Sequence, residues 1–254
     1  SLEPLKPGFL PGRAEQHLVR QIMSGLTRFA DDAPEPRGDM AHHWQVSDDG
    51  VTWLFFLRAS LWWHSGEPVT TEQVCRRLAS LLESPTLRAL FCSVRCVDTP
   101  QPWCIRFQLS VPDYWLPWRL ASYCSSLAHP DDDQNGCGPF RLARFQPRLV
   151  RLENHPRYHL AHPLLNAVEY WITPTLFDPA MGNSCRHPVQ LAIGENSDIP
   201  HLRPVSHQIS LGFCYLAIRQ QGRISRAQAR RLVQIIHQTA RVGTLSEESA
   251  LITP

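Results

Sequence analysis

Apolar residues recur every three or four positions in three segments of the chain, and this spacing predicts amphipathic helices. The first segment covers residues 13–28. The second covers residues 71–82 and follows Thr70, which forms a capping-box pattern with Gln73. The third lies near the C-terminus and begins with the same pattern at Ser225 and Gln228. We therefore expect three amphipathic helices, two of them with defined N-terminal caps.

The stretch between the first two helices has a different pattern. Charges and prolines in residues 31–36 predict an interruption of the chain. Residues 44–46 and 51–57 then flank the turn Ser-Asp-Asp-Gly at 47–50, and Asp-Gly supplies the positive φ that tight hairpins need. Because residues 51–57 are apolar at almost every position, we expect both faces of that strand to be covered.

Short strands alternate with turn signals over most of the remaining chain. An aromatic-rich helix interrupted near Pro117 is predicted for residues 113–123. The predicted strands are 94–97, 103–109, 140–145, 149–152, 168–172, 189–193 and 209–218. Helices and strands are mixed without strict βαβ alternation, which indicates a mixed sheet.

Composition narrows the function and the cellular compartment. The formal charge is +2, and Lys6 is the single lysine among 25 basic residues, so neither a phosphate-binding P-loop nor a Schiff-base lysine has a good candidate. The eight cysteines have irregular spacings, which favours free thiols and a cytoplasmic location over a periplasmic one. No apolar stretch reaches 18 residues, so we expect no membrane insertion, and no motif indicates a cofactor.

One acidic segment resembles the first half of a calcium-binding loop. Asp131, Asp133, Asn135 and Gly136 have the required spacing. The twelfth position, which needs a bidentate glutamate, is Leu142. A solvated acidic turn is therefore the better interpretation.

Three histidines lie close together in the sequence, as metal ligands often do. They are His155, His159 and His162, but Pro156 and Pro163 interrupt the segment and break a common helical face. We expect no metal site and no catalytic residues, since none of the common nucleophile or metalloprotease motifs occurs. A metal hydrolase built on these histidines stays open as an enzymatic alternative.

Four segments, in order, resemble the family 5 bacterial extracellular solute-binding proteins, which bind oligopeptides, dipeptides, nickel complexes and related ligands. Residues 44–53 (W-Q-V-S-D-D-G-V-T-W) resemble the family hairpin W-x-V-S-x-D-G-x-T. Residues 63–74 (W-H-S-G-E-P-V-T-T-E-Q-V) resemble F-H-D-G-x-P-V-T-A-x-D-V, the most specific match. The loop 136–140 (G-C-G-P-F) is similar to G-T-G-P-Y, and residues 154–158 resemble the N-x-x-Y that follows.

Within this family the chain is most similar to the SgrR-type transcriptional regulators. The residues that carry this resemblance are 40–45, 55–58 and 112–117. Such regulators join a winged helix-turn-helix domain to a solute-binding domain thought to sense a small molecule. The resemblance implies that DNA would be bound only through a domain outside this chain.

The resemblance also implies the fold. We expect an α/β, type II periplasmic-binding-protein-like lobe with a mixed sheet and an inserted, smaller α+β subdomain. The core of lobe I would comprise residues 1–35 and 129–254, and the subdomain residues 36–128. The second lobe is expected to be absent from this chain, with the ligand held between the two lobes by hinge closure.

Candidate ligand-binding residues follow from the loops and strand ends of the resembling segments. They are Phe9, Gly138, Phe140, Tyr215 and Arg219. Two positions depart from the family pattern: Cys137 replaces the usual threonine of the glycine loop, and Arg219 stands where many members have asparagine. The Cys137 thiol is expected to border the cleft, where it could be exposed.

The function implied is binding rather than catalysis. A small molecule or a peptide would bind in the cleft, and the chain would be the ligand-sensing part of a bacterial transcriptional regulator. The alternative is a periplasmic substrate-binding protein of an ABC transporter for peptides or nickel, whose partner would be the transporter permease.

Overall fold

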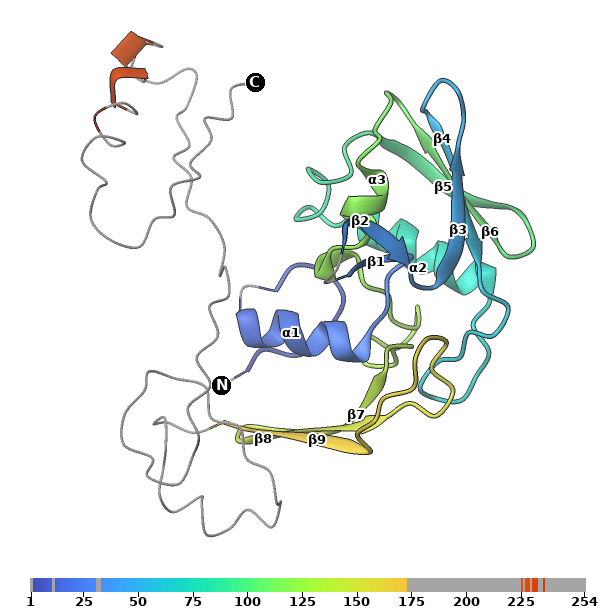
Figure 1. Ribbon diagram of the computed structural model, residues 1–254, viewed down its shortest axis with the longest axis vertical. Coiled ribbons are helices and arrows are strands. Elements are labelled where there is room, and N and C mark those ends of the chain that lie inside the picture. The colour runs from blue at the N-terminus through green and yellow to red at the C-terminus, as the bar shows by residue number, and fades with distance from the viewer. Residues whose placement is uncertain are drawn as a thin grey trace. The chain divides into compact units, whose positions relative to one another are not determined.

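The computed structural model describes residues 2–10, 12–30 and 33–172, and then residues 225, 227, 228, 230–232 and 235. The chain divides into two units between Ala192 and Ile193, and the elements labelled in Figure 1 belong to the first. The expected strands at 189–193 and 209–218 lie outside the described residues.

One predicted feature of the second unit is confirmed. Gln228 N–H donates to Ser225 Oγ at 3.3 Å, and Ser225 N–H donates to Gln228 Oε1 at 2.9 Å. These two bonds form the capping box that the sequence predicts.

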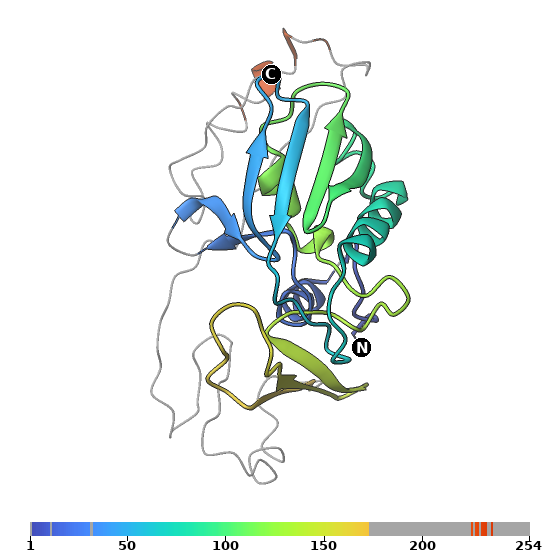
Figure 2. The same ribbon diagram turned by 90° about the vertical axis from the view of Figure 1, so that its right-hand side faces the viewer.

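A four-stranded antiparallel sheet contains the predicted hairpin (Figure 2). Its order is β3 (Ala41–Val46), β4 (Thr52–Leu57), β6 (Cys104–Leu109) and β5 (Val94–Gln101). The β3–β4 turn has Gly50 at φ +71°, which confirms the need for glycine there. On the buried face, Phe55 and Phe107 meet edge to face with 5.5 Å between ring centroids.

The burial of β4 corrects one expectation. Trp53, Phe55 and Leu57 are buried, whereas the residues between them are only partly covered. The strand is therefore covered fully on one face, and the prediction of two covered faces was wrong. Its neighbours β3 and β6 are both antiparallel partners, so one face can remain near solvent although the sequence is almost wholly apolar.

Helix α2 (Thr71–Glu83) packs against β5 and β6 and begins at the predicted cap. Gln73 N–H donates to Thr70 Oγ1, and Thr70 N–H donates to Gln73 Oε1. The same Gln73 oxygen accepts from the indole N–H of Trp63 at 2.9 Å. Because Trp63 is completely buried, this bond satisfies a donor that would otherwise lack a partner.

The N-terminal helix is shorter than predicted. Helix α1 covers Arg13–Ile22, and the following residues form the hairpin β1 (Thr27–Ala30) and β2 (Ala33–Gly38). The expected helix to residue 28 was therefore wrong, and a strand takes the place of the expected interruption from Ala33 onward. The β2 strand tolerates Pro34 and Pro36 because it is the edge of a two-stranded sheet.

Pro117 begins a helix instead of interrupting one. Helix α3 covers Leu116–Leu120 with this proline in its first turn, where a missing backbone N–H costs little. A short 3-10 helix, η1 (Tyr123–Ser125), follows. The predicted helix over residues 113–123 is thus replaced by two short helices.

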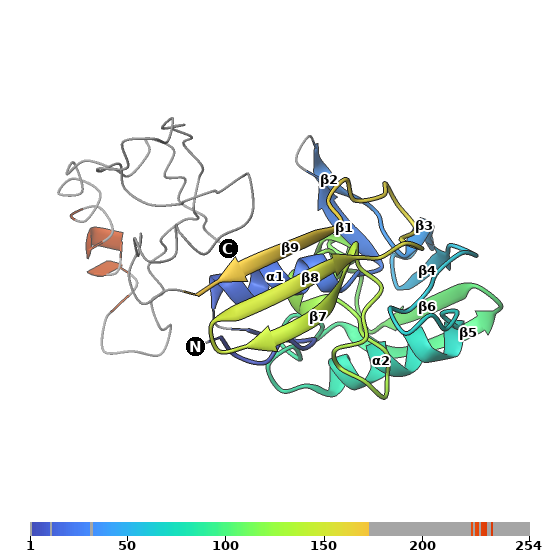
Figure 3. The same ribbon diagram turned by 90° about the horizontal axis from the view of Figure 1, so that it is seen from below.

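A second antiparallel sheet contains β7 (Phe140–Gln146), β8 (Leu149–Asn154) and β9 (Ala167–Trp171). It lies beside α1, as Figure 3 shows. Val150 and Leu152 of β8 are buried with Leu18, Val19 and Ile22 of α1 in one apolar cluster. A separate cluster joins the four-stranded sheet to α2 and α3.

Two general properties of the described elements are the direction of the strand pairs and the length of the helices. Every strand pair within the part of the chain that the structure describes is antiparallel. Among these same residues, no helix has the length and apolar character needed to span a bilayer. The division of the chain at residues 36 and 128 stays a prediction.

Candidate functional site

Three of the family-like segments meet at the carbonyl of Gly138. His64 Nε2 lies 3.0 Å from this oxygen, and His155 Nδ1 lies 3.2 Å from it, so each imidazole can donate a hydrogen bond. The two rings pack edge to face, with 4.8 Å between their centroids. In addition, His64 N–H donates to Gly136 O and His155 N–H donates to Pro139 O. The glycine loop is therefore held between the two histidine segments.

Both imidazoles are kept in the neutral form. Burial lowers the pKa of His64 to about 4, and the nearby His155 and Arg141 act in the same direction. Burial also lowers the pKa of His155. Since Nε2 of His64 donates to Gly138, its Nδ1 is the unprotonated atom; it is buried and has no hydrogen-bond partner among the described residues. A proton added there would be desolvated.

The glycine loop also contacts the end of α1. Gly138 N–H donates to Ile22 O at 2.8 Å. A Cβ atom on Gly138 would lie 2.6 Å from Ile22 C and 2.8 Å from Gln21 O, which are backbone atoms that cannot move aside. Glycine is required here because two segments of backbone approach closely.

Cys137 does not border a cleft in the way the sequence suggested. Its side chain is completely buried, and burial raises the pKa of its thiol. The expectation of an exposed thiol was wrong, since the glycine loop turns this side chain into the core of the four-stranded sheet and its helices. A buried neutral thiol behaves as a small apolar side chain.

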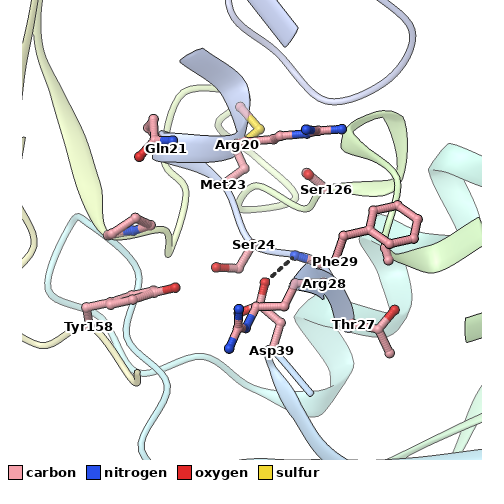
Figure 4. A pocket seen from close by; sticks show the side chains of 13 residues that line it. Arg20, Gln21, Met23, Ser24, Thr27, Arg28, Phe29, Asp39, Ser126 and Tyr158 are labelled. Atoms are coloured by element: carbon pink, nitrogen blue, oxygen red, sulfur yellow. Dashed lines mark hydrogen bonds between the residues drawn. The ribbon is translucent and has the colours of Figure 1, made fainter. Parts of the chain in front are cut away.

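A pocket of about 280 Å³ lies beside the glycine loop (Figure 4). Its walls come from the end of α1 and the α1–β1 connection, from β1, from the β2–β3 turn, and from the loops around Pro139 and Tyr158. The polar residues among those that line it are Arg20, Gln21, Ser24, Thr27, Arg28, Asp39, Ser126 and Tyr158. Met23, Phe29, Ala121 and Pro139 add apolar surface.

The one acidic side chain among these lining residues, Asp39, already has partners. Its Oδ2 accepts from Gly25 N–H at 3.1 Å, and its Oδ1 lies 2.7 Å from His159 Nε2. Asp39 is only 5% exposed. Its backbone carbonyl also accepts from Arg58 Nε at 2.7 Å. The carboxylate therefore fixes the α1–β1 connection and the His159 loop, and has little capacity left for a ligand.

Two other polar atoms of the pocket residues lack such partners. Arg28 Nε is buried and forms no hydrogen bond with any described residue, whereas the buried Ser24 Oγ has only loose contacts with the Tyr158 hydroxyl and the Cys137 thiol. The Tyr158 hydroxyl points toward Ser24 in Figure 4, and its contact with the Ser24 hydroxyl partly offsets the effect of burial on the pKa of Tyr158. Burial raises the pKa of Tyr158, so its hydroxyl stays protonated. An unsatisfied buried polar group typically costs about 1–3 kcal/mol, which makes these atoms candidates for ligand contact.

The structure places three of the five predicted binding residues. Phe9 is 59% exposed on the segment before α1. Gly138 is buried under α1, and Phe140 is partly buried against the apolar cluster of α1 and β8. Tyr215 and Arg219 lie outside the described residues. The assignment of all five to ligand binding stays a prediction.

Sequence reasoning did not select Ser24, Arg28 or Asp39. They come from the segment read as the end of a helix and from the turn after the unrecognised hairpin. Glycine at position 25 within an otherwise helical pattern was the available signal, since it marks a helix end.

The side chains considered as possible metal ligands form other contacts in the structure. His155 bonds to Gly138 and His159 to Asp39, so the two point to different partners. Asp131 pairs with Arg76 and Asp133 with Arg77, each at 2.7 Å. Among the residues described, no three histidine, cysteine, aspartate or glutamate side chains gather as a metal site would require.

The fold is that of a lobe of a type II periplasmic binding protein. A dipeptide-binding protein from Pseudoalteromonas sp. SM9913, solved in complex with Met-Leu, superposes with a TM-score of 0.62 at 16% sequence identity. The match covers 68% of this chain and 41% of that protein.

The chain belongs to the bacterial extracellular solute-binding proteins, family 5, whose middle region matches residues 35–177. It is 55% identical over 252 residues to the uncharacterized protein YbaE of Escherichia coli (strain K12), covering 99% of this chain and 44% of YbaE. It is 32% identical over 184 residues to the HTH-type transcriptional regulator SgrR of Yersinia enterocolitica serotype O:8 / biotype 1B, covering 69% of this chain and 32% of that regulator. The chain thus spans less than half the length of these relatives.

Proposed function

We propose that the chain is the ligand-sensing part of a bacterial transcriptional regulator, binding a small molecule or a peptide as a solute-binding domain. The observation that carries the proposal is the 32% identity to SgrR over 69% of this chain, because that relative is named as an HTH-type transcriptional regulator. DNA would be bound through a domain outside these residues. We expect a cytoplasmic location and no enzymatic activity.

The pocket beside the glycine loop supports the binding part of the proposal. It combines apolar walls with a few polar groups, as small-molecule sites usually do. One of those polar atoms, Arg28 Nε, is buried without a hydrogen-bond partner among the described residues, and Ser24 Oγ has only loose contacts, which is a state that a ligand could relieve. The pocket forms where the glycine loop and the Tyr158 segment meet the end of α1, and both carry the family resemblance.

The second candidate is a periplasmic substrate-binding protein of an ABC transporter for peptides or nickel. Its support is the fold, which the chain shares with a protein solved with the dipeptide Met-Leu. At 16% identity this similarity supports the shared fold and gives no information on the ligand. We therefore place the regulator first. In the transporter alternative, the partner would be a membrane permease.

Cell fractionation distinguishes the two candidates. The natural gene that contains this sequence would be expressed with a C-terminal tag, and the cytoplasmic and periplasmic fractions would be probed separately. We expect the tagged protein in the cytoplasm and bound to DNA in a cross-linking pull-down. Recovery from the periplasm without DNA would contradict the regulator and favour the transporter component.

Ligand binding itself is tested by calorimetry on the full-length product of the natural gene that contains this sequence, because the ligand is expected to lie between two lobes. Small metabolites and short peptides would be titrated in parallel, with heat-denatured protein as the control. Saturable heat that is absent from the denatured sample supports a binding protein. A full-length protein that binds nothing in either class would contradict the proposal.

A further inference from the structure

We infer that the pocket lined by Ser24, Arg28 and Tyr158 binds an anionic oxygen group of the ligand, either a carboxylate or a phosphate. This inference rests on the proposed function and names the chemistry that the binding site recognises. It depends on the balance of charges and of hydrogen-bond donors in the pocket.

The charge balance favours an anion. Two arginines, Arg20 and Arg28, line the pocket, whereas Asp39 is its one acidic lining residue. The Asp39 carboxylate is already bonded to Gly25 N–H and His159 and is almost completely buried. A cationic ligand would meet two like charges and an occupied carboxylate. An anionic group would meet two cations instead.

The available hydrogen-bonding groups are donors. The guanidinium of Arg28 can only donate, and its Nε–H has no acceptor among the described residues. The Ser24 hydroxyl has only loose contacts with Tyr158 and Cys137, and this residue is 3% exposed. The Tyr158 hydroxyl keeps its proton because burial raises its pKa. In Figure 4 the Ser24 and Tyr158 hydroxyls and the Arg28 side chain converge on the same space.

A second hollow of the molecule contains arginines that are already paired, in contrast to Arg28. It lies beside β7 and β8 and also contains arginines, Arg141 and Arg151. Both are paired: Arg141 with Glu153 at 2.8 Å, and Arg151 with Glu169 at 2.7 Å. Arginines whose charge is already balanced offer an anion little gain. The unpaired donors therefore favour the pocket at Arg28 as the anion site.

The test is an NMR titration of the isotope-labelled 254-residue chain at constant ionic strength. The probes are succinate, inorganic phosphate and the neutral analogue succinamide. We expect succinate or phosphate to shift the amide signals of Ser24 and Gly25, and succinamide to leave them unchanged. Whichever of succinate and phosphate binds with the higher affinity identifies the carboxylate or the phosphate as the preferred group.

Two variants and two matched controls locate the site. Arg28→Gln removes the charge and Ser24→Ala removes the hydroxyl, and each should weaken anion binding by about tenfold. Arg88→Gln and Ser80→Ala alter an exposed arginine and an exposed serine away from the pocket, and both should bind as the wild type does. Unchanged binding by Arg28→Gln, or equal shifts with succinamide, would overturn the inference.

The failure of this inference can be distinguished from the failure of the proposed function. If neutral solutes or peptides bind and neither anion does, the domain is a receptor and the anion site is wrong. If no probe and no solute binds, both proposals fail. Unfolding curves of Arg28→Gln and Ser24→Ala, recorded alongside, establish that the variants remain folded during the titration.

Discussion

The imidazole rings of His64 and His155 share one acceptor, the carbonyl oxygen of Gly138. The two histidines are 91 positions apart in the sequence, and the loop that they hold lies between them. Because burial lowers the pKa of both rings, protonation of either imidazole weakens this junction. The junction therefore makes the stability of the fold depend on pH.

We predict that acidification destabilises the protein through His64. The pKa of His64 is about 4 in the folded chain, compared with 6.5 for an unperturbed histidine. Below pH 6.5 the unfolded chain binds the proton and the folded chain does not, so stability falls as the pH drops from 6.5 toward 4. At pH 5 the loss from this residue is about 2 kcal/mol. Urea unfolding at pH 7.5 and pH 5 measures it.

The variant His64→Gln should lose most of this pH dependence, since glutamine keeps an N–H donor but does not titrate. His42→Gln, at an exposed histidine, is the control and should retain it. A His64→Gln protein with the same loss of stability at pH 5 as the wild type would contradict the assignment.

We predict that Gly138→Ala destabilises the fold by more than about 2 kcal/mol. The added methyl group would overlap the backbone of Gln21 and Ile22, and relief of that overlap would separate the loop from α1. Thermal unfolding followed by circular dichroism measures the change. Ser65→Ala, on the exposed neighbouring turn, is the control with an expected change within about 0.5 kcal/mol. A Gly138→Ala protein as stable as this control would show that the loop does not pack closely against α1.

The local parts of the fold could be predicted from the sequence. Thr70 and Gln73 mark the start of α2, and Asp49-Gly50 marks the β3–β4 turn, because each signal acts over a few neighbouring residues. The end of α1 could not be placed in this way. Leu26 continues the helical spacing of Ile22, but Gly25 N–H bonds to Asp39 and Asp39 N–H bonds to Leu26 O. Because of these bonds between distant segments, the chain after α1 forms a hairpin instead of continuing as a helix.

The same argument explains why the pocket was missed. Ser24, Arg28 and Asp39 belong to no recognisable local motif, and Tyr158, which ends the N-x-x-Y segment, comes from a distant part of the chain. The resemblance to the solute-binding family did find the glycine loop, which forms one wall of the pocket through Pro139. The family resemblance thus identified a loop that lines the pocket. Which of the surrounding side chains lack hydrogen-bond partners could be learned only from the structure.

We predict two classes of thiol in the native protein. The six described cysteines are free, and of these Cys92 and Cys96 are exposed whereas Cys104, Cys124 and Cys137 are buried. Because reactivity requires an accessible thiolate, an alkylating reagent should label Cys92 and Cys96 first. Mass spectrometry of the labelled peptides measures the order. In denatured, freshly purified protein all eight cysteines should react. Early labelling of Cys137 would mean that the glycine loop opens readily.

We predict that two adjacent arginines on α2 contribute very differently to stability. Arg77 is 8% exposed; its Nε donates to Ala128 O at 3.1 Å, and its Nη2 donates to His129 O and pairs with Asp133 at 2.7 Å. Arg76 pairs with Asp131 at 2.7 Å, but both side chains are largely exposed. These contacts tie α2 to the connection that follows residue 128, where the sequence predicts a return to the lobe core.

Arg77→Met should lower the free energy of unfolding by about 2–4 kcal/mol, because it leaves two carbonyl oxygens and a carboxylate without their donor. Arg76→Met should cost less than about 1 kcal/mol, since solvent screens an exposed ion pair. Urea unfolding of the two variants and the wild type at pH 7.5 measures both, and the adjacent positions make them matched controls for helix propensity and charge. Equal losses would contradict the prediction, since Arg77 would then act only as a surface charge.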